Sequence, residues 1–273
     1  MSHPLLPGVL ALVQQAGEAI LPFWRQGVEV VEKADASPVT AADLAAHRIL
    51  ADGLQALDAG IAVLSEEDAD IALSERAGWS RWWLVDPLDG TKEFIADSEE
   101  FTVNVALIER GEVVFGVVGI PATGVIYHGG HEFGAWRIEP GKQPQAISMR
   151  ETPASGLTVV ASRRHGSALQ EQLLAALVSR FGDIERISVG SSLKFCQLAE
   201  GSADFYPRLA PTSQWDTAAA QGVLEGAGGV VLTLQGEPLR YAARESLLNP
   251  FFLALPADAE WRGLIVEEAR ALG

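Results

Sequence analysis

Apolar side chains recur at two spacings along this chain, three to four residues apart in some segments and every second residue in others. The first spacing indicates a helix with one buried face, and the second indicates a strand. The pattern predicts helices over 5–20 and from Thr40, a suitable N-cap, to about Leu57. The strands that it predicts next are 61–64, 81–85, 102–109, 113–120, 124–128 and 133–138. Short connections between the later strands predict an antiparallel sheet.

A polar stretch rich in turn-forming residues, 139–156, is the expected boundary between two parts of the chain. Beyond it, predicted strands and helices alternate. The strands are 157–161, 184–189, 204–207, 230–234 and 251–255, and the helices are 167–181, 191–200, 215–228 and 257–271. We therefore expect an α+β protein in which 1–150 form a half with an antiparallel sheet and 151–273 form an α/β half.

Composition narrows the class of protein. The 273 residues are 48% hydrophobic, as expected of a globular chain, and carry a formal charge of −16, which argues against a nucleic-acid partner. The one cysteine, Cys196, excludes a disulfide framework and a cysteine-rich zinc site, and fits the reducing cytoplasm. The N-terminus lacks a basic leader, and we expect neither a signal peptide nor an integral membrane segment. Peripheral association with the inner membrane stays open.

The segment WWLVDPLDGTKEF, 82–94, carries the most informative chemistry. A predicted strand delivers Asp86, Pro87 turns the chain, Asp89 follows, and Gly90 permits a tight turn before Thr91 begins a helix. Two carboxylates, the carbonyl of residue 88 and a hydroxyl thus lie within one turn. These hard oxygen ligands suit Mg²⁺ rather than zinc or copper.

Further carboxylates stand at the ends of other predicted elements. Glu66 and Glu67 follow a strand, and Asp216 follows Trp215 at an expected helix N-terminus. Each motif alone has an ordinary alternative: DPLDG as a surface turn, SEED as a solvated acidic loop, and Asp216 as a helix cap. If the two strands are neighbours, the carboxylates of SEED and DPLDG meet at one sheet edge. The three motifs together favour a metal site, because each carboxylate stands where a strand or helix ends. The HGGH run, 128–131, favours a hairpin over a metal pair, and Cys196 favours a buried helix position.

These motifs together resemble the inositol monophosphatase superfamily of Mg²⁺-dependent, lithium-sensitive phosphatases. The resemblance lies in SEE, WLVDPLDGTKEF and WDTAAA, and it extends from about residue 5 to 255. The segments closest to the 3′(2′),5′-bisphosphate nucleotidase branch are KADASPVTAAD (33–43), DGTKEF (89–94), ASRRH (161–165), GSSLKFC (190–196) and PRLAPTSQWDTAAA (207–220). The resemblance implies a layered αβαβα sandwich.

The resemblance also implies roles for individual residues. The ligands of two or three Mg²⁺ ions would be Glu66, Asp86, the Leu88 carbonyl, Asp89 and Asp216. Asp43 and Thr91 would orient and activate the attacking water, and Glu67 would hold a ligand or a coordinated water. The substrate would be lined by Glu66, Leu88, Asp89, Gly90, Thr91 and Asp216, and the nucleotide and its second phosphate by His165, Ser191, Lys194 and Arg208. Arg164 departs from the pattern, because the resemblance leads us to expect a small polar residue there in many relatives.

The function so implied is hydrolysis of adenosine 3′,5′-bisphosphate (PAP) to AMP and phosphate, with the related phosphosulfate PAPS as a further substrate. The implied cellular role is PAP removal in support of sulfur assimilation, by a monomer or homodimer in the cytoplasm. Two alternatives stay open. One is an inositol-1-phosphate or other sugar-phosphate phosphatase with the same chemistry, and the other is a non-catalytic module that senses metal or nucleotide.

Overall fold

The computed structural model describes residues 2–26, 30–32, 38–151, 156–161 and 168–272. Three residues singled out by the motifs, Lys33, Arg164 and His165, lie outside these ranges. The helices are α1 (Leu6–Ile20), α2 (Ala41–Leu57), α3 (Leu73–Arg76), α4 (Thr91–Ile95), α5 (Ala168–Phe181), α6 (Leu193–Ala199), α7 (Ala218–Gly226) and α8 (Arg262–Leu272), with a 3₁₀ turn η1 at Leu21–Phe23. The first strands are β1 (Val30–Glu32), β2 (Pro38–Thr40), β3 (Ala62–Ser65), β4 (Arg81–Asp89), β5 (Thr102–Glu109), β6 (Glu112–Ile120) and β7 (Val125–Gly130). The later strands are β8 (Gly134–Ile138), β9 (Gln145–Ile147), β10 (Leu157–Ala161), β11 (Ile184–Ser188), β12 (Tyr206–Arg208), β13 (Gly229–Thr233) and β14 (Phe252–Pro256).

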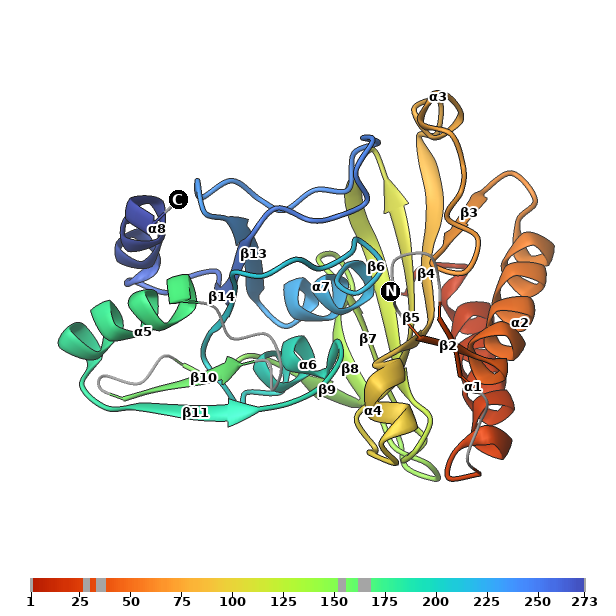
Figure 1. Ribbon diagram of the computed structural model, residues 1–273, viewed down its shortest axis with the longest axis horizontal. Coiled ribbons are helices and arrows are strands. Elements are labelled where there is room, and N and C mark those ends of the chain that lie inside the picture. The colour runs from red at the N-terminus through yellow and green to blue at the C-terminus, as the bar shows by residue number, and fades with distance from the viewer. Residues whose placement is uncertain (1, 27–29, 33–37, 152–155, 162–167, 273) are drawn as a thin grey trace.

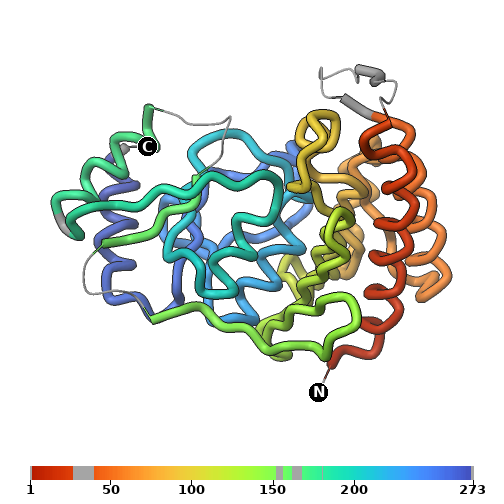
Figure 2. Tube along the Cα trace, turned by 90° about the horizontal axis from the view of Figure 1, so that it is seen from below, coloured from red at the N-terminus to blue at the C-terminus, as the bar shows by residue number. Residues whose placement is uncertain are grey.

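The elements stack in layers in the order helix, sheet, helix, sheet, helix (Figure 1). The pair α1 and α2 covers one face of a seven-stranded sheet, and α6 and α7 lie against its other face. Strands β10–β14 form smaller sheets beyond α6, and α5 and α8 pack together at the far end (Figure 2). This arrangement confirms the expected α+β sandwich.

The large sheet has the order β3-β4-β5-β6-β7-β8-β9. Only the β3–β4 pair in it is parallel, and every other neighbouring pair is antiparallel. The antiparallel run of strands between 102 and 138 therefore forms as the sequence pattern predicts. The parallel pair matters for function, because it brings the ends of β3 and β4 to the same edge of the sheet.

Alternation along β5 divides its side chains between two cores. Val103, Val105 and Leu107 join the core beneath α1 and α2. Ala106 and Ile108 join the core on the α6 and α7 side. A third core lies between the smaller sheets and the outer helices α5 and α8. Because the side-chain period of a strand is two, the polar residues Thr102 and Asn104 share the α6 and α7 side with Ala106.

The contact between α7 and the large sheet depends on glycine. Gly116 in β6 lies so close to the helix that a β-carbon added there would stand 1.9 Å from the carbonyl oxygen of Ala219. Gly222 in the helix faces the same strand, and a β-carbon added there would stand 2.6 Å from the backbone nitrogen of Gly116. A helix that follows the boundary stretch thus packs directly on the sheet that precedes it. The division of the chain into residues 1–150 and 151–273 stays a prediction.

Several element ends differ from the sequence pattern. Strand β4 does not stop at Asp86 but continues through Pro87 to Asp89, with a register irregularity between the two aspartates. Proline is tolerated there because a bulge leaves a position without a ladder hydrogen bond. The helix expected from residue 215 begins at Ala218, so that Asp216 lies in the turn before it.

The first helix is apolar enough to raise the question of a membrane. By length and composition alone, Leu6–Phe23 is the one described helical segment that could cross a bilayer. In the folded chain, Val9, Val13 and Ile20 are fully or almost fully buried in the core beneath the large sheet. The apolar face of α1 is therefore used for packing within the protein, as its amphipathic spacing predicts.

Candidate active site

Three aspartates from distant parts of the chain converge at the end of β4. Asp86, Asp89 and Asp216 each offer a carboxylate oxygen, and these atoms lie within 4.8 Å of one another. The first two come from the irregular end of β4, and the third from the turn before α7. Asp216 is held there because its Oδ2 accepts hydrogen bonds from the Thr212 hydroxyl at 2.7 Å and the Ser213 N–H at 2.9 Å.

Glu66 is brought to the same edge by the parallel strand pair. Ser65 lies in register with Val85, and the Glu66 N–H donates to the Val85 carbonyl at 3.0 Å. The side chain of Glu66 shares a hydrogen bond with Asp86 and raises its pKa. The expectation that SEED and DPLDG meet at one sheet edge is therefore confirmed for Glu66.

Burial and like charge act together on these carboxyl groups. Desolvation raises the pKa of Asp86 well above its usual value, and Glu66 and Asp89 raise it further. Desolvation and the charge of Asp216 raise the pKa of Asp89 to about 7, against the lowering effect of the Lys194 ammonium. Burial also raises the pKa of Asp216. Such a cluster is costly when ionised, because each carboxylate is desolvated beside another negative charge.

The donor set fits a hard divalent cation. It consists of close carboxylate oxygens, with the carbonyl oxygen of Leu88 between the two aspartates of β4. In the part of the chain that the structure describes, no sulfur or imidazole joins this set. The turn is ordered by a hydrogen bond from the Leu88 N–H to Asp86 Oδ1 at 3.0 Å. Mg²⁺ and related ions take oxygen ligands of this kind, and a bound cation would offset the repulsion among them.

A second group of side chains lies beside the cluster. The Thr91 hydroxyl is 3.3 Å from Asp43 Oδ1 and 3.3 Å from the Leu88 carbonyl oxygen. Asp43 is positioned by the start of α2, where its Oδ2 accepts from the Thr40 N–H at 2.8 Å and the Thr40 hydroxyl at 2.7 Å. Burial raises the pKa of Asp43, the Thr40 bonds lower it, and the nearby charge of Glu67 raises it.

Gly90 makes the turn between β4 and α4 possible. Its φ of 89° lies in the left-handed region, and a β-carbon would stand 3.0 Å from the Glu100 carbonyl oxygen. Both facts favour glycine at this position. The helix α4 then begins at Thr91, as the sequence predicts.

Three residues predicted to bind the nucleotide lie near the cluster. Lys194 is 6% exposed, donates from Nζ to the Ser191 carbonyl at 2.6 Å, and has its pKa lowered to about 8, chiefly by burial. The buried Arg208 donates to the carbonyl oxygens of Ala210 and Pro211, and its charge lowers the pKa of Asp216. Lys194 is thus a buried cation beside the aspartates rather than a solvated surface residue. His165 lies outside the described residues.

Several polar residues that contact the clustered aspartates were not predicted from the sequence. Thr102, Asn104, Ser192 and Thr212 are all buried and hydrogen-bonded to a cluster aspartate or to one another. A signal exists for two of them, because Thr102 and Asn104 are the polar residues at alternate positions of the otherwise apolar TVNVAL run. Threonine has ordinary strand propensity, so this pattern did not stand out.

Two other sequence features have structural roles. Cys196 is fully buried in α6, and burial raises the pKa of its thiol. His128 belongs to β7, which forms a hairpin with β8, and burial lowers the pKa of His128 to about 4. The helix and hairpin interpretations of these two segments are therefore confirmed.

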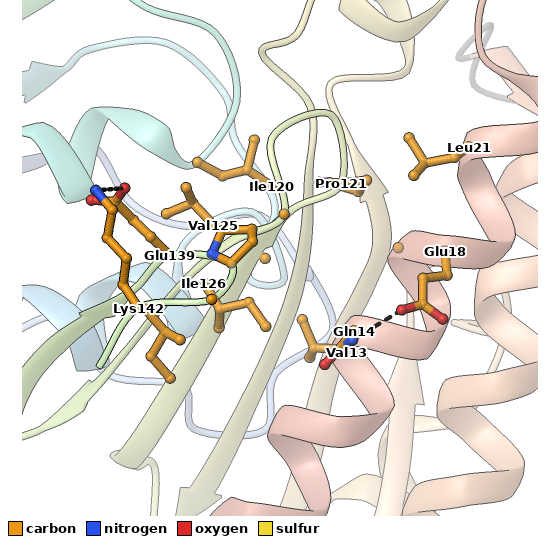
Figure 3. A pocket seen from close by; sticks show the side chains of 16 residues that line it. Val13, Gln14, Glu18, Leu21, Ile120, Pro121, Val125, Ile126, Glu139 and Lys142 are labelled. Atoms are coloured by element: carbon orange, nitrogen blue, oxygen red, sulfur yellow. Dashed lines mark hydrogen bonds and ion pairs between the residues drawn. The ribbon is translucent and has the colours of Figure 1, made fainter. Parts of the chain in front are cut away.

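A cleft of about 510 Å³ lies elsewhere, between α1 and the turn that joins β6 to β7 (Figure 3). Its walls are largely apolar, and two carboxylates stand at its rim. Glu18 accepts from Gln14 at 2.9 Å, and Glu139 pairs with Lys142 at 2.7 Å. No member of the aspartate cluster lines it, so this cleft is separate from the candidate site.

Comparison with known proteins places this geometry in a family. Residues 2–271 match the inositol monophosphatase family. The 3′(2′),5′-bisphosphate nucleotidase CysQ of Escherichia coli K12 is 48% identical over 250 residues, which cover 91% of this chain and 98% of that protein. The protein of the same name from Aggregatibacter actinomycetemcomitans is 37% identical over 94% of this chain and 95% of its own length.

Solved structures agree with the sequence comparison. The crystal structure of CysQ from Bacteroides thetaiotaomicron, described as a bacterial member of the inositol monophosphatase family, matches with a TM-score of 0.81 and 36% identity. It covers 94% of this chain and 99% of that chain. An inositol monophosphatase from Thermotoga maritima shares the fold at a TM-score of 0.77 and 21% identity, over 99% and 98% of the two chains. The aspartate cluster therefore stands in a chain that belongs to the inositol monophosphatase family.

Proposed function

We propose that this protein is a Mg²⁺-dependent 3′(2′),5′-bisphosphate nucleotidase that hydrolyses PAP to AMP and phosphate. The observation that carries the proposal is the convergence of Asp86, Asp89 and Asp216 within 4.8 Å. It occurs in a chain that is 48% identical to a protein named for this activity over nearly the whole of that protein's length. Every carboxylate that the resemblance requires is present, which argues against a non-catalytic sensor.

The residues that would hold the cations are Glu66, Asp86, Asp89, Asp216 and the carbonyl of Leu88. Bound divalent cations lower the pKa of coordinated water and neutralise charge on a phosphate group and its leaving oxygen. The chain's own contribution is to keep the carboxylates together in a partly buried site, where their attraction for a cation is strengthened. Gly90, with Thr91 at the start of α4, would line the phosphate together with the ligands.

Thr91 and Asp43 form the proposed proton path. The Thr91 hydroxyl donates to Asp43, so its oxygen is left to accept a hydrogen bond from the attacking water. The water oxygen forms its bond to phosphorus as the bond from phosphorus to the ribose oxygen breaks, and the released ribose oxygen takes up a proton from solvent water. The proton of the water passes through Thr91 to Asp43, whose raised pKa favours receiving it. Glu67 adds negative charge beside Asp43.

The second phosphate of PAP needs a positive partner of its own. Lys194 and Arg208 supply buried positive charge next to the aspartates, and Ser191 lies between Lys194 and the turn after β4. We assign these residues, with His165, to the nucleotide and its second phosphate. Hydrolysis of PAPS, sensitivity to lithium, a cytoplasmic location and a role in sulfur assimilation follow from the same proposal.

The deciding experiment compares phosphate release from PAP, inositol-1-phosphate and fructose-1,6-bisphosphate with and without Mg²⁺. We expect turnover that depends on Mg²⁺ and a kcat/KM that is highest for PAP. Preference for inositol-1-phosphate would keep the metal chemistry and overturn the nucleotidase assignment. Absence of turnover with all three substrates would favour the non-catalytic alternative.

A pair of variants tests the metal assignment. Asp86→Asn should abolish turnover while the fold, monitored by circular dichroism, stays intact. Asp258→Asn makes the same chemical change at an exposed position far along the chain and should retain full activity. Full activity of Asp86→Asn would remove Asp86 from the proposed ligand set.

A further inference from the structure

The loop before α6 is bound directly to the turn that carries the aspartates. The Ser192 N–H donates to Asp89 Oδ2 at 2.5 Å, and the Gly190 N–H donates to Glu100 Oε2 at 2.8 Å. Between them, Ser191 has a φ of 44°, a backbone conformation that residues other than glycine seldom adopt. The chain therefore accepts an unfavourable backbone angle where its amides reach both the aspartate turn and Glu100.

Three buried side chains complete this connection. Thr102, Asn104 and Ser192 are at most 2% exposed. The Ser192 hydroxyl donates to Asn104 Oδ1 at 2.9 Å and lies 2.9 Å from the Thr102 hydroxyl. Since the single proton of Ser192 goes to Asn104, Thr102 is the donor in the second bond. The Asn104 amide nitrogen in turn lies 3.5 Å from Asp89 Oδ2.

The strand register explains why these residues meet. Asn104 is the partner of Asp86 across the β4–β5 ladder, and Thr102 is the partner of Asp89. Their side chains lie on the face of the sheet that also carries Ala106 and packs against α6 and α7. Thr102 and Asn104 thus stand beside aspartates, on the side from which the Ser192 loop approaches.

We propose that Thr102, Asn104 and Ser192 are positioning residues for cation binding. The Ser192 N–H and the Asn104 amide donate to Asp89 Oδ2, and Thr102 donates to the Ser192 hydroxyl that in turn orients Asn104. The other oxygen of Asp89, Oδ1, is left to face the cation. The proposal rests on the proposed function, because it takes Asp89 as a metal ligand. It goes beyond that function by making the affinity for Mg²⁺ depend on two strand residues and a loop residue that are not among the proposed ligands.

The alternative is a merely structural network that ties the loop to the sheet. The two differ in what a deletion changes. A positioning role requires that loss of a hydroxyl weaken Mg²⁺ binding, since Asp89 then samples other orientations. A structural role requires only that loss of the hydroxyl lower the melting temperature of the protein with and without metal alike.

The test uses Thr102→Val, which keeps the shape and removes the hydroxyl, and Thr102→Ser, which restores the hydroxyl. Mg²⁺ binding is measured by calorimetry and by the rise in melting temperature with added Mg²⁺, neither of which needs turnover. We expect Thr102→Val to weaken Mg²⁺ binding by about tenfold. We expect kcat at saturating Mg²⁺ to stay near the wild-type value and Thr102→Ser to recover most of the affinity. Thr123→Val, at an exposed turn outside the network, is the matched control and should leave Mg²⁺ binding unchanged.

A Thr102→Val protein with a lower melting temperature but unchanged Mg²⁺ affinity would overturn the proposal. If Thr102→Val does not fold, Ser192→Ala gives the same test, because it keeps the backbone N–H to Asp89. With both variants folded, the double variant should lose less than the sum of the two single losses, since one network is broken twice. Wild-type protein that binds Mg²⁺ but releases no phosphate would sink the proposed function, and the binding comparison would still judge the positioning role.

Discussion

Asp43 has two separate tasks at the level of a single residue. One carboxylate oxygen closes a capping box with Thr40 at the start of α2, and the other accepts from Thr91. The orientation of the proposed proton acceptor is therefore set by helix capping, a local interaction between residues three apart. This is why TAAD could be identified from sequence as a helix start and why the same aspartate is held in place at the site.

Substitution of Thr91 tests the proposed proton path. Thr91→Ala removes the hydroxyl between water and Asp43, and we expect kcat to fall on the order of 10²-fold or more. Thr91→Ser keeps the hydroxyl and should retain most of the activity. Steady-state kinetics with PAP at saturating Mg²⁺ measures both. Equal activity in the alanine and serine variants would exclude Thr91 from proton transfer.

Lys194 offers a test of substrate choice. Lys194→Met removes the positive charge and keeps the length of the side chain. If Lys194 binds the second phosphate, kcat/KM for PAP should fall about tenfold or more beyond the loss for inositol-1-phosphate. Lys142→Met, at an exposed lysine that lines the separate cleft, is the control. Equal losses on both substrates would mean that Lys194 serves the aspartates rather than the nucleotide.

At the scale of elements, sequence periodicity predicted most helices and strands but not how their ends are used. Strand β5 has the predicted bounds, 102–109. Its side chains pack on two cores, so it is apolar along most of its length, and this run is visible in the sequence. The contacts of Thr102 and Asn104 with the aspartates were not predicted. They depend on the register with β4 and on a loop some ninety residues later in the chain. Long-range partners of this kind leave only a faint trace in one sequence.

In the candidate site, too, the residues were predicted but the path of the backbone was not. Asp86, Asp89, Glu66 and Asp216 were identified through residue type and a family resemblance, and the fold brings them together. The extension of β4 through Pro87 was not predicted, since proline normally ends a strand. Its cause is the bulge between the two aspartates, which the pairing with β5 determines and the local sequence does not.

The packing of α7 on β6 gives a prediction for stability. Gly116→Ala places a methyl group against the Ala219 carbonyl, and we expect the free energy of unfolding to fall by about 1–3 kcal/mol. Gly263→Ala, in α8, meets no atom within 4 Å and should leave stability unchanged or raise it by less than about 1 kcal/mol. Urea unfolding monitored by tryptophan fluorescence measures both. Equal stability of the two variants would refute the close approach of α7.

At the scale of the whole molecule, the candidate site lies at an interface between layers. Asp86 and Asp89 belong to the large sheet, whereas Asp216 precedes the helix that covers it. The cluster therefore exists only while α7 is docked on the sheet. The repulsion among its carboxylates opposes that docking, and a bound cation would favour it.

The pH dependence of stability follows from the raised pKa values. In the metal-free protein, Asp89 has a pKa of about 7 against an ordinary value of 3.8. Between these values the folded chain binds more protons than the unfolded chain, so the free energy of unfolding should fall as pH rises from about 4 to 7. Mg²⁺ should oppose this fall. Thermal melts across that pH window, with chelator and with Mg²⁺, measure the difference, and parallel curves would contradict a charged cluster.

The single cysteine can report on the opening of the fold. Cys196 lies in α6, four residues after the loop that contacts Asp89, and its thiol has no solvent exposure. A disulfide reagent can reach that sulfur only when α6 detaches or the chain unfolds, and burial keeps the thiol protonated until then. The labelling rate of the unmodified protein therefore measures how often the layers separate. Added Mg²⁺ should slow that labelling rate, and the effect should grow with the affinity of Mg²⁺ for the aspartate cluster.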